Sequence, residues 1–473
     1  MYRKFGAIHK YVPNHCREEK SSSVESNMKQ KRNSTVSGQQ VDCAELRACV
    51  ERMAVEAERQ LRAMAHPEMK ERLKAKVKKA LGRPGYAGDL IFWPAGLLML
   101  GLLEADHLQV VEEYLGEWIR QGMPVKNPDD ALTGSVLIRL YRRTGKEPYR
   151  KGAEKIAQYL ESCRRDTLGS VVYGQRSSNR WIYADGAGQV SMFCAEYADA
   201  FGTGTSAQAA QPEEPRNEAK KLAEQANLEL SNFALCGMDE AAGLPYHGYD
   251  AESGACYGII GWGRAAGWLM MGIAAWNRSY AEAEKSTESI PVSKVRPDCS
   301  QEKDSQKTAA HENAGQNLND KIVRMRDSIV PAILTRRRED GLFSWQLDCR
   351  KGPLDTSASG MIYYSLLTGD LLRKGGDANL SAAGNVSGQE TLSNGTAQKN
   401  AWDAGGVLAE DIEDIYAAAA KALLGYVDEN GRVQQSSAEC IDFAQYRQQY
   451  GNNPWGQGAV LAFLAAYSKK VKI

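Results

Sequence analysis

Hydrophobic residues recur along much of this chain at spacings of three and four positions, the spacing of an amphipathic α-helix. The segment "AELRACVERMAVEAERQL", residues 44–61, shows this pattern first. A second kind of segment, "IFWPAGLLMLGLLEA" at residues 91–105, is apolar on nearly every face. Such a segment predicts a helix that is buried on all sides. The chain is therefore expected to combine half-exposed and fully buried helices.

The two kinds of helix alternate. Apolar helices are predicted in "TGSVLIRLYRRTG", "GQVSMFCAEYADAFG", "GRAAGWLMMGIAAWN", "TSASGMIYYSLLTG" and "WGQGAVLAFLAAYSKK". Amphipathic segments such as "PYRKGAEKIAQYLESC" follow the first four. A buried ring of inner helices covered by outer helices explains this alternation. We therefore predict an all-α fold, a single (α/α)6 barrel of about six helical hairpins. A helical solenoid is the alternative, but it would repeat at a fixed period of roughly 34–45 residues, and the spacing here is uneven.

Polar tracts interrupt the helical pattern. Residues 1–42 are poor in apolar side chains and predict a disordered N-terminal arm, which leaves residues 43–473 for the barrel. Two low-complexity tracts, at about 282–319 and 375–401, fall between periodic segments and are expected to be surface insertions. A shorter insertion, "GTGTSAQAAQPEEP", follows Phe201.

Composition narrows the function classes. The 473 residues are 43% hydrophobic and carry 59 basic and 59 acidic side chains. Zero net charge gives no reason to expect nucleic acid or an anionic membrane surface as a partner. The sequence shows neither a signal-peptide core nor an apolar run of about 20 residues, so we expect a cytoplasmic protein. The ten cysteines include no CxxC pair, which argues against a zinc site. We expect no metal and no cofactor, and the sequence leaves the oligomeric state open.

The turns that precede the apolar helices carry most of the chain's unusual polar and aromatic residues. In an α/α barrel these turns meet at one end. The residues are Asp129 and Asp130; Trp181, Tyr183 and Asp185; Tyr246, His247, Tyr249 and Asp250; Trp262, Arg264 and Trp268; Asp355, Thr356 and Ser357; Trp455 and Gln457. Aromatic faces pack against sugar rings, a guanidinium binds a substrate carboxylate with two hydrogen bonds, and two carboxylates suffice for most glycosidic chemistry. The set predicts a carbohydrate site.

Each of these residues also has a structural interpretation. An aspartate before a helix often caps it, which applies to Asp129, Asp130 and Asp185. His247 could be a hydrogen-bonded structural histidine, and the tryptophans could belong to the core. Arg264, between glycines and near two tryptophans, is a poor candidate for a solvated surface charge. The combination favours a site more strongly than any single residue does.

The motifs resemble those of a known family. "GWGRAAGW" resembles the WGRxNGW signature of glycoside hydrolase family 105, the unsaturated rhamnogalacturonyl hydrolases, and of the related family 88. The other resembling elements, in family order between Tyr86 and Tyr467, are "NPDDALTG", "WIYADGAGQ", "GLPYHGYD", "GLFSWQLDCRKGPLDTSASG" and "NNPWGQG". The resemblance implies an (α/α)6 barrel. It also implies hydration of the C4=C5 double bond of an unsaturated uronate at the nonreducing end of a pectin-derived (rhamnogalacturonan) oligosaccharide.

The resemblance also implies roles for single residues. The general acid/base falls on Asp185 and the second carboxylate on Asp129, with the adjacent Asp130 as the other contender. The implied substrate-binding residues are Asp130, Tyr183, His247, Trp262, Arg264 and Trp268, and we include Trp93 with them. The chain departs from the family at Met192–Cys194, where Pro-Phe-Leu is usual, at Ala266 in place of Asn, and at Asp355 in place of Glu. These changes bear on the substrate more than on the reaction.

In the implied reaction, protonated Asp185 delivers its proton to C4, water adds at C5, and the resulting hemiketal opens and releases the rest of the sugar. Burial and a neighbouring carboxylate are expected to raise the pKa of the acid. Three alternatives remain open. They are an inverting glycosidase acting on saturated sugars, a sugar epimerase, and a carbohydrate-binding protein without activity. An epimerase usually needs a histidine pair, and His247 is the one histidine within these motifs.

Overall fold

The computed structural model describes residues 41–66, 88–202, 213–288, 302–372, 411–441 and 445–471, with the single residues 69, 73, 77 and 443. The predicted N-terminal arm lies outside the described residues except for positions 41 and 42, and the tract at 375–401 lies outside them entirely. Within the tract at 282–319, residues 282–288 and 302–319 are helical, whereas 289–301 are not described. The limits of the barrel and of its insertions therefore stay predictions.

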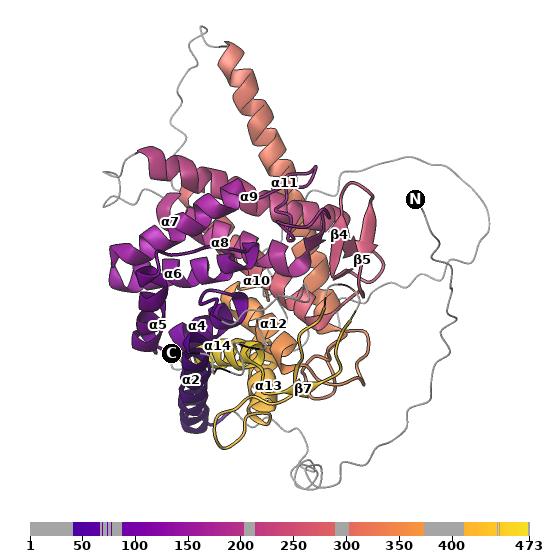
Figure 1. The fold of residues 1–473 in the computed structure, drawn as a ribbon. Helices are drawn as coiled ribbons and strands as arrows, with labels where there is room; N and C mark the ends of the chain where they lie inside the picture. Colours follow the sequence, from indigo (N-terminus) through magenta and orange to yellow (C-terminus); the bar gives the residue numbers. More distant parts are fainter. Residues whose placement is uncertain are drawn as a thin grey trace, which may run out of the picture. The chain divides into compact units, whose positions relative to one another are not determined.

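Six helices form an inner ring. They are α4 (Trp93–Glu104), α6 (Ala131–Thr144), α8 (Ala184–Gly202), α10 (Gly263–Glu288), α12 (Thr356–Thr368) and α14 (Pro454–Lys470). Each packs against the next, and α14 packs against α4, so that the ring closes (Figure 1). The predicted apolar segments supply these helices. In α4, for example, all nine residues from Ala95 to Leu103 are buried.

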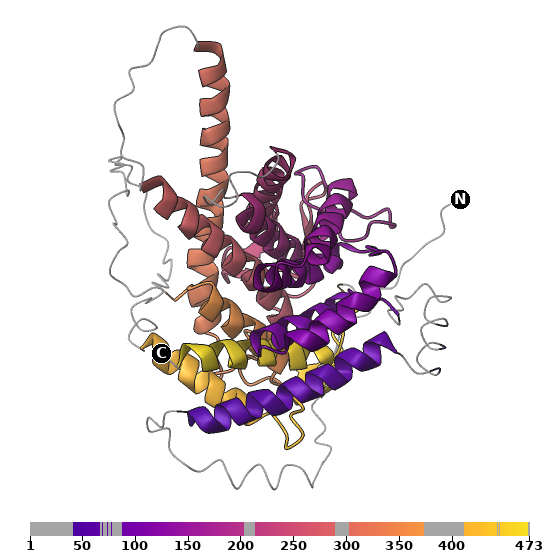
Figure 2. The same cartoon turned by 90° about the vertical axis from the view of Figure 1, so that its left-hand side faces the viewer.

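Six further helices cover the ring. They are α2 (Cys43–Ala65), α5 (Leu108–Arg120), α7 (Glu147–Ser162), α9 (Glu213–Cys236), α11 (Glu302–Leu334) and α13 (Ile412–Leu424). The pairing follows the chain, because α5 packs on α4, α7 on α6 and α9 on α8. Figure 2 shows α2 beside α14, which joins the beginning of the barrel to its end. The described residues thus contain twelve α-helices in two layers, and the predicted (α/α)6 barrel is confirmed.

The inner helices approach one another so closely that glycine is required at their contacts. A Cβ atom added at Gly458 of α14 would lie 2.4 Å from the backbone of Leu97 in α4. A Cβ added at Gly188 of α8 would lie 2.2 Å from the carbonyl oxygen of Trp268 in α10. The other four contacts of the ring also contain glycines that face the next helix, namely Gly96, Gly134, Gly267 and Gly360. At Gly188, Gly360 and Gly458 an added Cβ would meet backbone, so a side chain there would force neighbouring helices apart. At Gly96, Gly134 and Gly267 it would meet a side chain of the next helix, which would have to move.

An ionic network joins the inner helices near their carboxyl ends. The Arg139 guanidinium donates to Glu104 Oε1 at 2.8 Å, to Tyr364 Oη at 2.6 Å and to Glu196 Oε1 at 2.7 Å. Arg278 also donates to Glu196 Oε1, at 2.9 Å. Burial works to raise the pKa of Glu196, but Arg139 and Arg278 outweigh it and the pKa is lowered. The carboxylate is therefore charged and paired at this end of the barrel.

Short strands lie in the loops at the opposite end of the barrel, where the inner helices begin. Strands β1 (Ile182–Tyr183), β4 (Gly248–Asp250) and β5 (Ala255–Tyr257) form an antiparallel sheet in the order β1-β4-β5, with Gly248 paired to both Tyr183 and Tyr257. Two further pairs are β2 (Met238–Asp239) with β3 (Leu244–Pro245), and β6 (Ser436–Ser437) with β7 (Tyr450–Gly451). Among the helices described, none is both long and apolar enough to cross a bilayer.

Replacing Gly458 with alanine should destabilise the barrel, because the new methyl group would press on the backbone of Leu97. Overpacking of this kind typically costs about 1–3 kcal/mol. Gly116 of α5 is the matched control, since an added Cβ would meet nothing closer than 3.6 Å, at Arg120 Nη1. Alanine there should stabilise the helix by roughly 0.5–1 kcal/mol. Chemical denaturation of both variants measures the difference, and equal effects would contradict the close approach of α4 and α14.

Candidate active site

The predicted site residues gather at the amino-terminal ends of the inner helices. Trp93 begins α4, and Asp129 lies in a short 3-10 helix, η1 (Pro128–Asp130), that leads into α6. Asp185 and Arg264 lie in the first turns of α8 and α10, and Trp455 lies in that of α14. The amino-terminal end of a helix carries unsatisfied N–H groups and the positive end of the helix dipole. This end of the barrel therefore favours an anionic ligand.

Asp129 is a buried carboxyl with one hydrogen-bond donor. It is 2% exposed, and its Oδ2 accepts a 2.6 Å hydrogen bond from the Tyr173 hydroxyl. Its Oδ1 is buried and has no hydrogen-bond partner among the described residues. Burial raises the pKa of Asp129 to about 7, the hydrogen bond from Tyr173 opposes this rise, and the nearby charge of Asp185 adds to it. A large share of Asp129 is therefore protonated at neutral pH.

Asp130 has a local structural role. Its Oδ2 accepts hydrogen bonds from the backbone N–H groups of Lys126, at 2.8 Å, and Asn127, at 3.1 Å, within a capping box around η1. Burial raises the pKa of Asp130 well above its usual value, and the nearby charge of Asp89 adds to this rise. Capping thus describes Asp130 better than substrate binding. Of the two neighbouring carboxyls, Asp129 fits the role of the second carboxylate.

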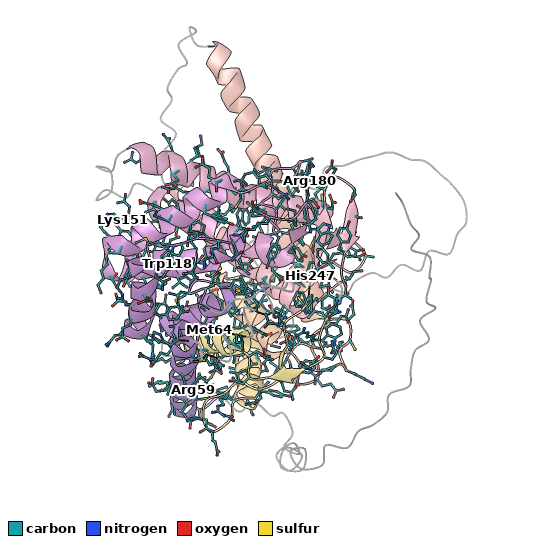
Figure 3. The ribbon with its side chains drawn as sticks, in the orientation of Figure 1. Arg59, Met64, Trp118, Lys151, Arg180 and His247 are labelled. Atoms are coloured by element: carbon teal, nitrogen blue, oxygen red, sulfur yellow. The ribbon has the colours of Figure 1, made fainter. Side chains whose placement is uncertain are left out.

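Asp185 faces a histidine. Its side chain is 18% exposed, and its Oδ2 lies 3.4 Å from Nε2 of His247, a residue that is itself 1% exposed. The other carboxylate oxygen, Oδ1, is buried without a hydrogen-bond partner in the described part of the chain. Figure 3 labels His247, which directly precedes β4. Asp185 is therefore the more accessible member of a pair whose other member, Asp129, is fully enclosed.

Tyr173, which the sequence analysis missed, binds Asp129 and lies close to the helical turn that carries Asp185. Its hydroxyl binds Asp129, and its ring lies 3.1 Å from where a Cβ on Gly186, the residue after Asp185, would stand. Helix α9 fixes the turn before Tyr173, because Glu229 Oε1 accepts from Val171 N–H at 2.7 Å. Burial raises the pKa of Glu229 to about 8, so this enclosed carboxyl is mostly protonated at neutral pH. No sequence motif marks Tyr173, since its role depends on a turn held from a distant helix.

An aromatic cluster surrounds His247. The ring centroid of His247 lies 4.4 Å from Trp262, 5.3 Å from Tyr183 and 5.1 Å from Phe443. Phe443 stacks on Tyr183, with centroids 4.4 Å apart and planes at 14°. The Tyr446 hydroxyl lies 2.8 Å from His247 Nδ1. Phe443 and Tyr446 come from the segment between β6 and β7, and the sequence analysis missed both because no motif covers that polar stretch.

Arg264 is buried, and its guanidinium binds backbone carbonyl groups. Its two terminal nitrogens donate to the carbonyl oxygens of Ser437, at 2.9 Å, and Ala438, at 3.0 Å. The guanidinium carbon lies 4.9 Å from the Trp262 ring centroid and 5.3 Å from that of Trp455. Arg264 therefore ties the segment after β6 to the beginning of α10. Its predicted contact with a substrate carboxylate stays a prediction.

The tryptophans divide into two groups. Trp262 and Trp268 are each 3% exposed, which agrees with the core interpretation. Trp93 and Trp455 are half-buried, and their ring centroids lie 5.2 Å apart. Trp93 and Trp455 are therefore better placed than Trp262 and Trp268 to offer a ring face to a sugar.

Asp355, which stands where the related families have glutamate, is also structural. It caps α12 by accepting from Ser357 N–H at 3.0 Å, and it accepts from the Ser437 hydroxyl at 2.6 Å. Like Arg264, it holds the segment that carries Phe443 and Tyr446.

Comparison with known proteins agrees with this geometry. The sequence profile described as Glycosyl Hydrolase Family 88 matches residues 62–292. Over this stretch, just under half of the chain, the protein is similar to glycoside hydrolase family 88. The resemblance carried by its motifs is thus confirmed, and the relationship supports an enzyme of the glycoside hydrolase class. No curated protein sequence matches the chain.

Solved structures share the fold of these families. A possible member of family 105 from Klebsiella pneumoniae is 15% identical, with a TM-score of 0.63 over 96% of this chain and 100% of its own. A family 105 glycoside hydrolase from C. acetobutylicum is 20% identical, with a TM-score of 0.51 over 85% of this chain and 100% of its own. An unsaturated glucuronyl hydrolase specific for heparin is 14% identical, with a TM-score of 0.54 over 91% of this chain and 99% of its own. At these identities the likeness shows the barrel.

Replacing Tyr173 with phenylalanine should raise the pKa of Asp129 further above 7, because the lost hydrogen bond stabilises the ionised carboxylate. Carboxyl ¹³C NMR titration measures this, with the Asp129 signal assigned by its loss in Asp129→Asn. Tyr197→Phe is the matched control, since Tyr197 donates to Glu218, a carboxylate outside the site, at 2.8 Å. A pKa of Asp129 that is unchanged in Tyr173→Phe, or that falls, would contradict the role assigned to Tyr173.

Proposed function

We propose that this protein is a glycoside hydrolase that releases a 4,5-unsaturated uronic acid from the nonreducing end of an oligosaccharide by hydrating its C4=C5 double bond. The observation that carries the proposal is the coupled carboxyl pair, in which Asp129 has a pKa of about 7 and Asp185 remains accessible. The relationship to family 88 supports the same reaction class. Two neighbouring carboxyls, one of which has a pKa raised toward neutrality, are a usual arrangement for acid/base catalysis near pH 7.

The reaction begins with proton transfer to C4. Asp185 delivers the proton, and positive charge develops at C5 and on the ring oxygen. Water then adds at C5, while the Asp185 carboxylate accepts a proton from that water. The resulting hemiketal opens when the bond from C5 to the ring oxygen breaks. This leaves a hemiacetal at C1, whose bond to the glycosidic oxygen then breaks and releases the remaining sugar. General acid/base catalysis of this kind typically contributes about 10²–10⁴-fold in rate.

Asp129 supports this cycle electrostatically. Because its pKa is about 7, Asp129 can hold a proton at a pH where an ordinary aspartate is ionised. The helix ends around the pair would favour the uronate carboxylate.

The proposed substrate is a pectin-derived, rhamnogalacturonan oligosaccharide, as the family 105 motifs suggest. A structural relative is specific for heparin, so the identity of the sugar attached to the uronate is to be determined by direct assay. A cytoplasmic location remains a prediction from the sequence. An inverting glycosidase acting on saturated sugars would use the same two carboxyls, and its substrates distinguish it.

Asp185→Asn should leave folding intact and abolish turnover, because the amide can neither donate the acid proton nor accept one from water. The measurement is the loss of absorbance near 235 nm when enzyme is mixed with lyase-digested rhamnogalacturonan. Asp348→Asn is the control, because Asp348 pairs with Arg336 outside the site and is 46% exposed.

Retained turnover by Asp185→Asn would contradict the assignment of the acid. No absorbance loss with rhamnogalacturonan, homogalacturonan and chondroitin digests, together with cleavage of a saturated nitrophenyl glycoside, would favour the inverting glycosidase.

A further inference from the structure

The His247 ring lies between a tyrosine hydroxyl and the proposed catalytic acid. Its Nδ1 is 2.8 Å from Tyr446 Oη, and its Nε2 is 3.4 Å from Asp185 Oδ2. Tyr446 lies in the segment that joins β6 to β7, close to the carboxyl end of the chain, whereas Asp185 begins α8. A neutral imidazole has one donor nitrogen and one acceptor nitrogen, so the Tyr446 contact decides what His247 presents to Asp185.

The direction of the Tyr446 hydrogen bond follows from a third group. The backbone N–H of Ile259 donates to the Tyr446 oxygen at 3.3 Å. Because an N–H group can only donate, the tyrosine oxygen accepts there and its own hydrogen is available for His247 Nδ1. Burial raises the pKa of Tyr446, so the hydroxyl keeps this hydrogen at neutral pH. Among the described residues this hydrogen has no other acceptor than Nδ1, which favours donation from Tyr446 to Nδ1 and places the hydrogen of a neutral His247 on Nε2.

The chain leaves space for this contact at Gly258. This glycine has a φ of +78°, and a Cβ added to it would lie 2.5 Å from Tyr446 Oη and 2.6 Å from His247 Cβ. Trp262 packs against both rings, with its centroid 4.4 Å from His247 and 5.4 Å from Tyr446. The arrangement is thus enclosed on several sides, and a side chain at position 258 would separate the two partners.

We propose that Tyr446 is a positioning residue that holds His247 in the tautomer whose Nε2–H points at the Asp185 carboxylate. The proposal deepens the proposed function and rests on it for the role of Asp185. The Nε2–H group would stabilise Asp185 as a carboxylate after it has delivered its proton, at the moment when it accepts one from water. The other tautomer would turn a nitrogen lone pair toward the carboxylate and repel it. Nε2 is buried and makes no hydrogen bond within the described part of the chain, although it lies 3.4 Å from Asp185 Oδ2. Catalytic contacts of this kind commonly shorten and align only when substrate binds.

The first test reads the tautomer directly in the unmodified protein. ¹⁵N NMR distinguishes a protonated from an unprotonated imidazole nitrogen, and His247→Gln identifies the signals of His247 among those of the six histidines. The expected result at neutral pH is a proton on Nε2 and none on Nδ1. A proton on Nδ1, alone or together with Nε2, overturns the proposal. This experiment needs no substrate, so failure of the proposed activity would leave its outcome readable.

The second test removes the donor. Tyr446→Phe should mix the two tautomers and lower kcat by about tenfold, the worth of one hydrogen bond, with KM little changed. Tyr450→Phe is the matched control, because Tyr450 lies on β7 and donates to the Gln448 side chain at 2.6 Å. Gly258→Ala should reproduce the Tyr446→Phe effect by separating Tyr446 from His247. An unchanged ¹⁵N signature and an unchanged kcat in Tyr446→Phe, with the fold retained, would overturn the proposal.

Discussion

The close approach of neighbouring inner helices is the constraint on which the rest of the structure depends. At the contact of α14 with α4 and at that of α8 with α10, an added methyl group would lie within 2.4 Å of backbone atoms. Glycine at these points lets six helices close into one ring with their amino-terminal ends together. The loops at that end then bring side chains from residue 93 to residue 455 into one site. No single segment contains the site, because the ring assembles it.

Buried carboxyls at the two ends of the ring have opposite pKa shifts. At one end, Arg139 and Arg278 pair with Glu196 and lower its pKa despite burial. At the other, Asp129 is just as enclosed but receives a neutral hydroxyl instead of a cation, and burial raises its pKa to about 7. A charged pair joins helices, whereas an unpaired carboxyl of raised pKa can hold and release a proton. This difference separates the structural end of the barrel from the candidate active site.

The sequence predicts the barrel well, because helix periodicity is a property of the chain itself, and the order of the motifs predicts a candidate site at one end of the barrel. It also suggests Asp129 and Asp185, which the structure brings within electrostatic reach of each other. It does not separate Asp129 from Asp130, since only the folded turn shows that Asp130 binds the backbone of residues 126 and 127.

The residues that the sequence misses depend on distant contacts. Tyr173 is placed by Glu229 of α9, and Tyr446 reaches His247 across nearly 200 positions of the chain, from residue 446 to residue 247. No local pattern of hydrophobic and polar residues records such a contact. Arg264 shows the converse, because a motif identifies it while the fold reveals that its guanidinium holds the backbone of Ser437 and Ala438.

The central claim is that the carboxyl pair protonates a carbon atom of the substrate. Running the reaction in D₂O with an unsaturated uronide and examining the released uronic acid product by NMR tests this most directly. Hydration of the double bond places deuterium on C4 of the product, because the acid of the pair exchanges with solvent before it delivers its proton. An ordinary hydrolysis first releases the unsaturated sugar, whose later ring opening takes up deuterium at C4 from the solvent without stereochemical control. One deuterium on a single face of C4 in product sampled early is the predicted result, and an early product that keeps its C4=C5 double bond, or that carries deuterium equally on both faces of C4, would contradict the account.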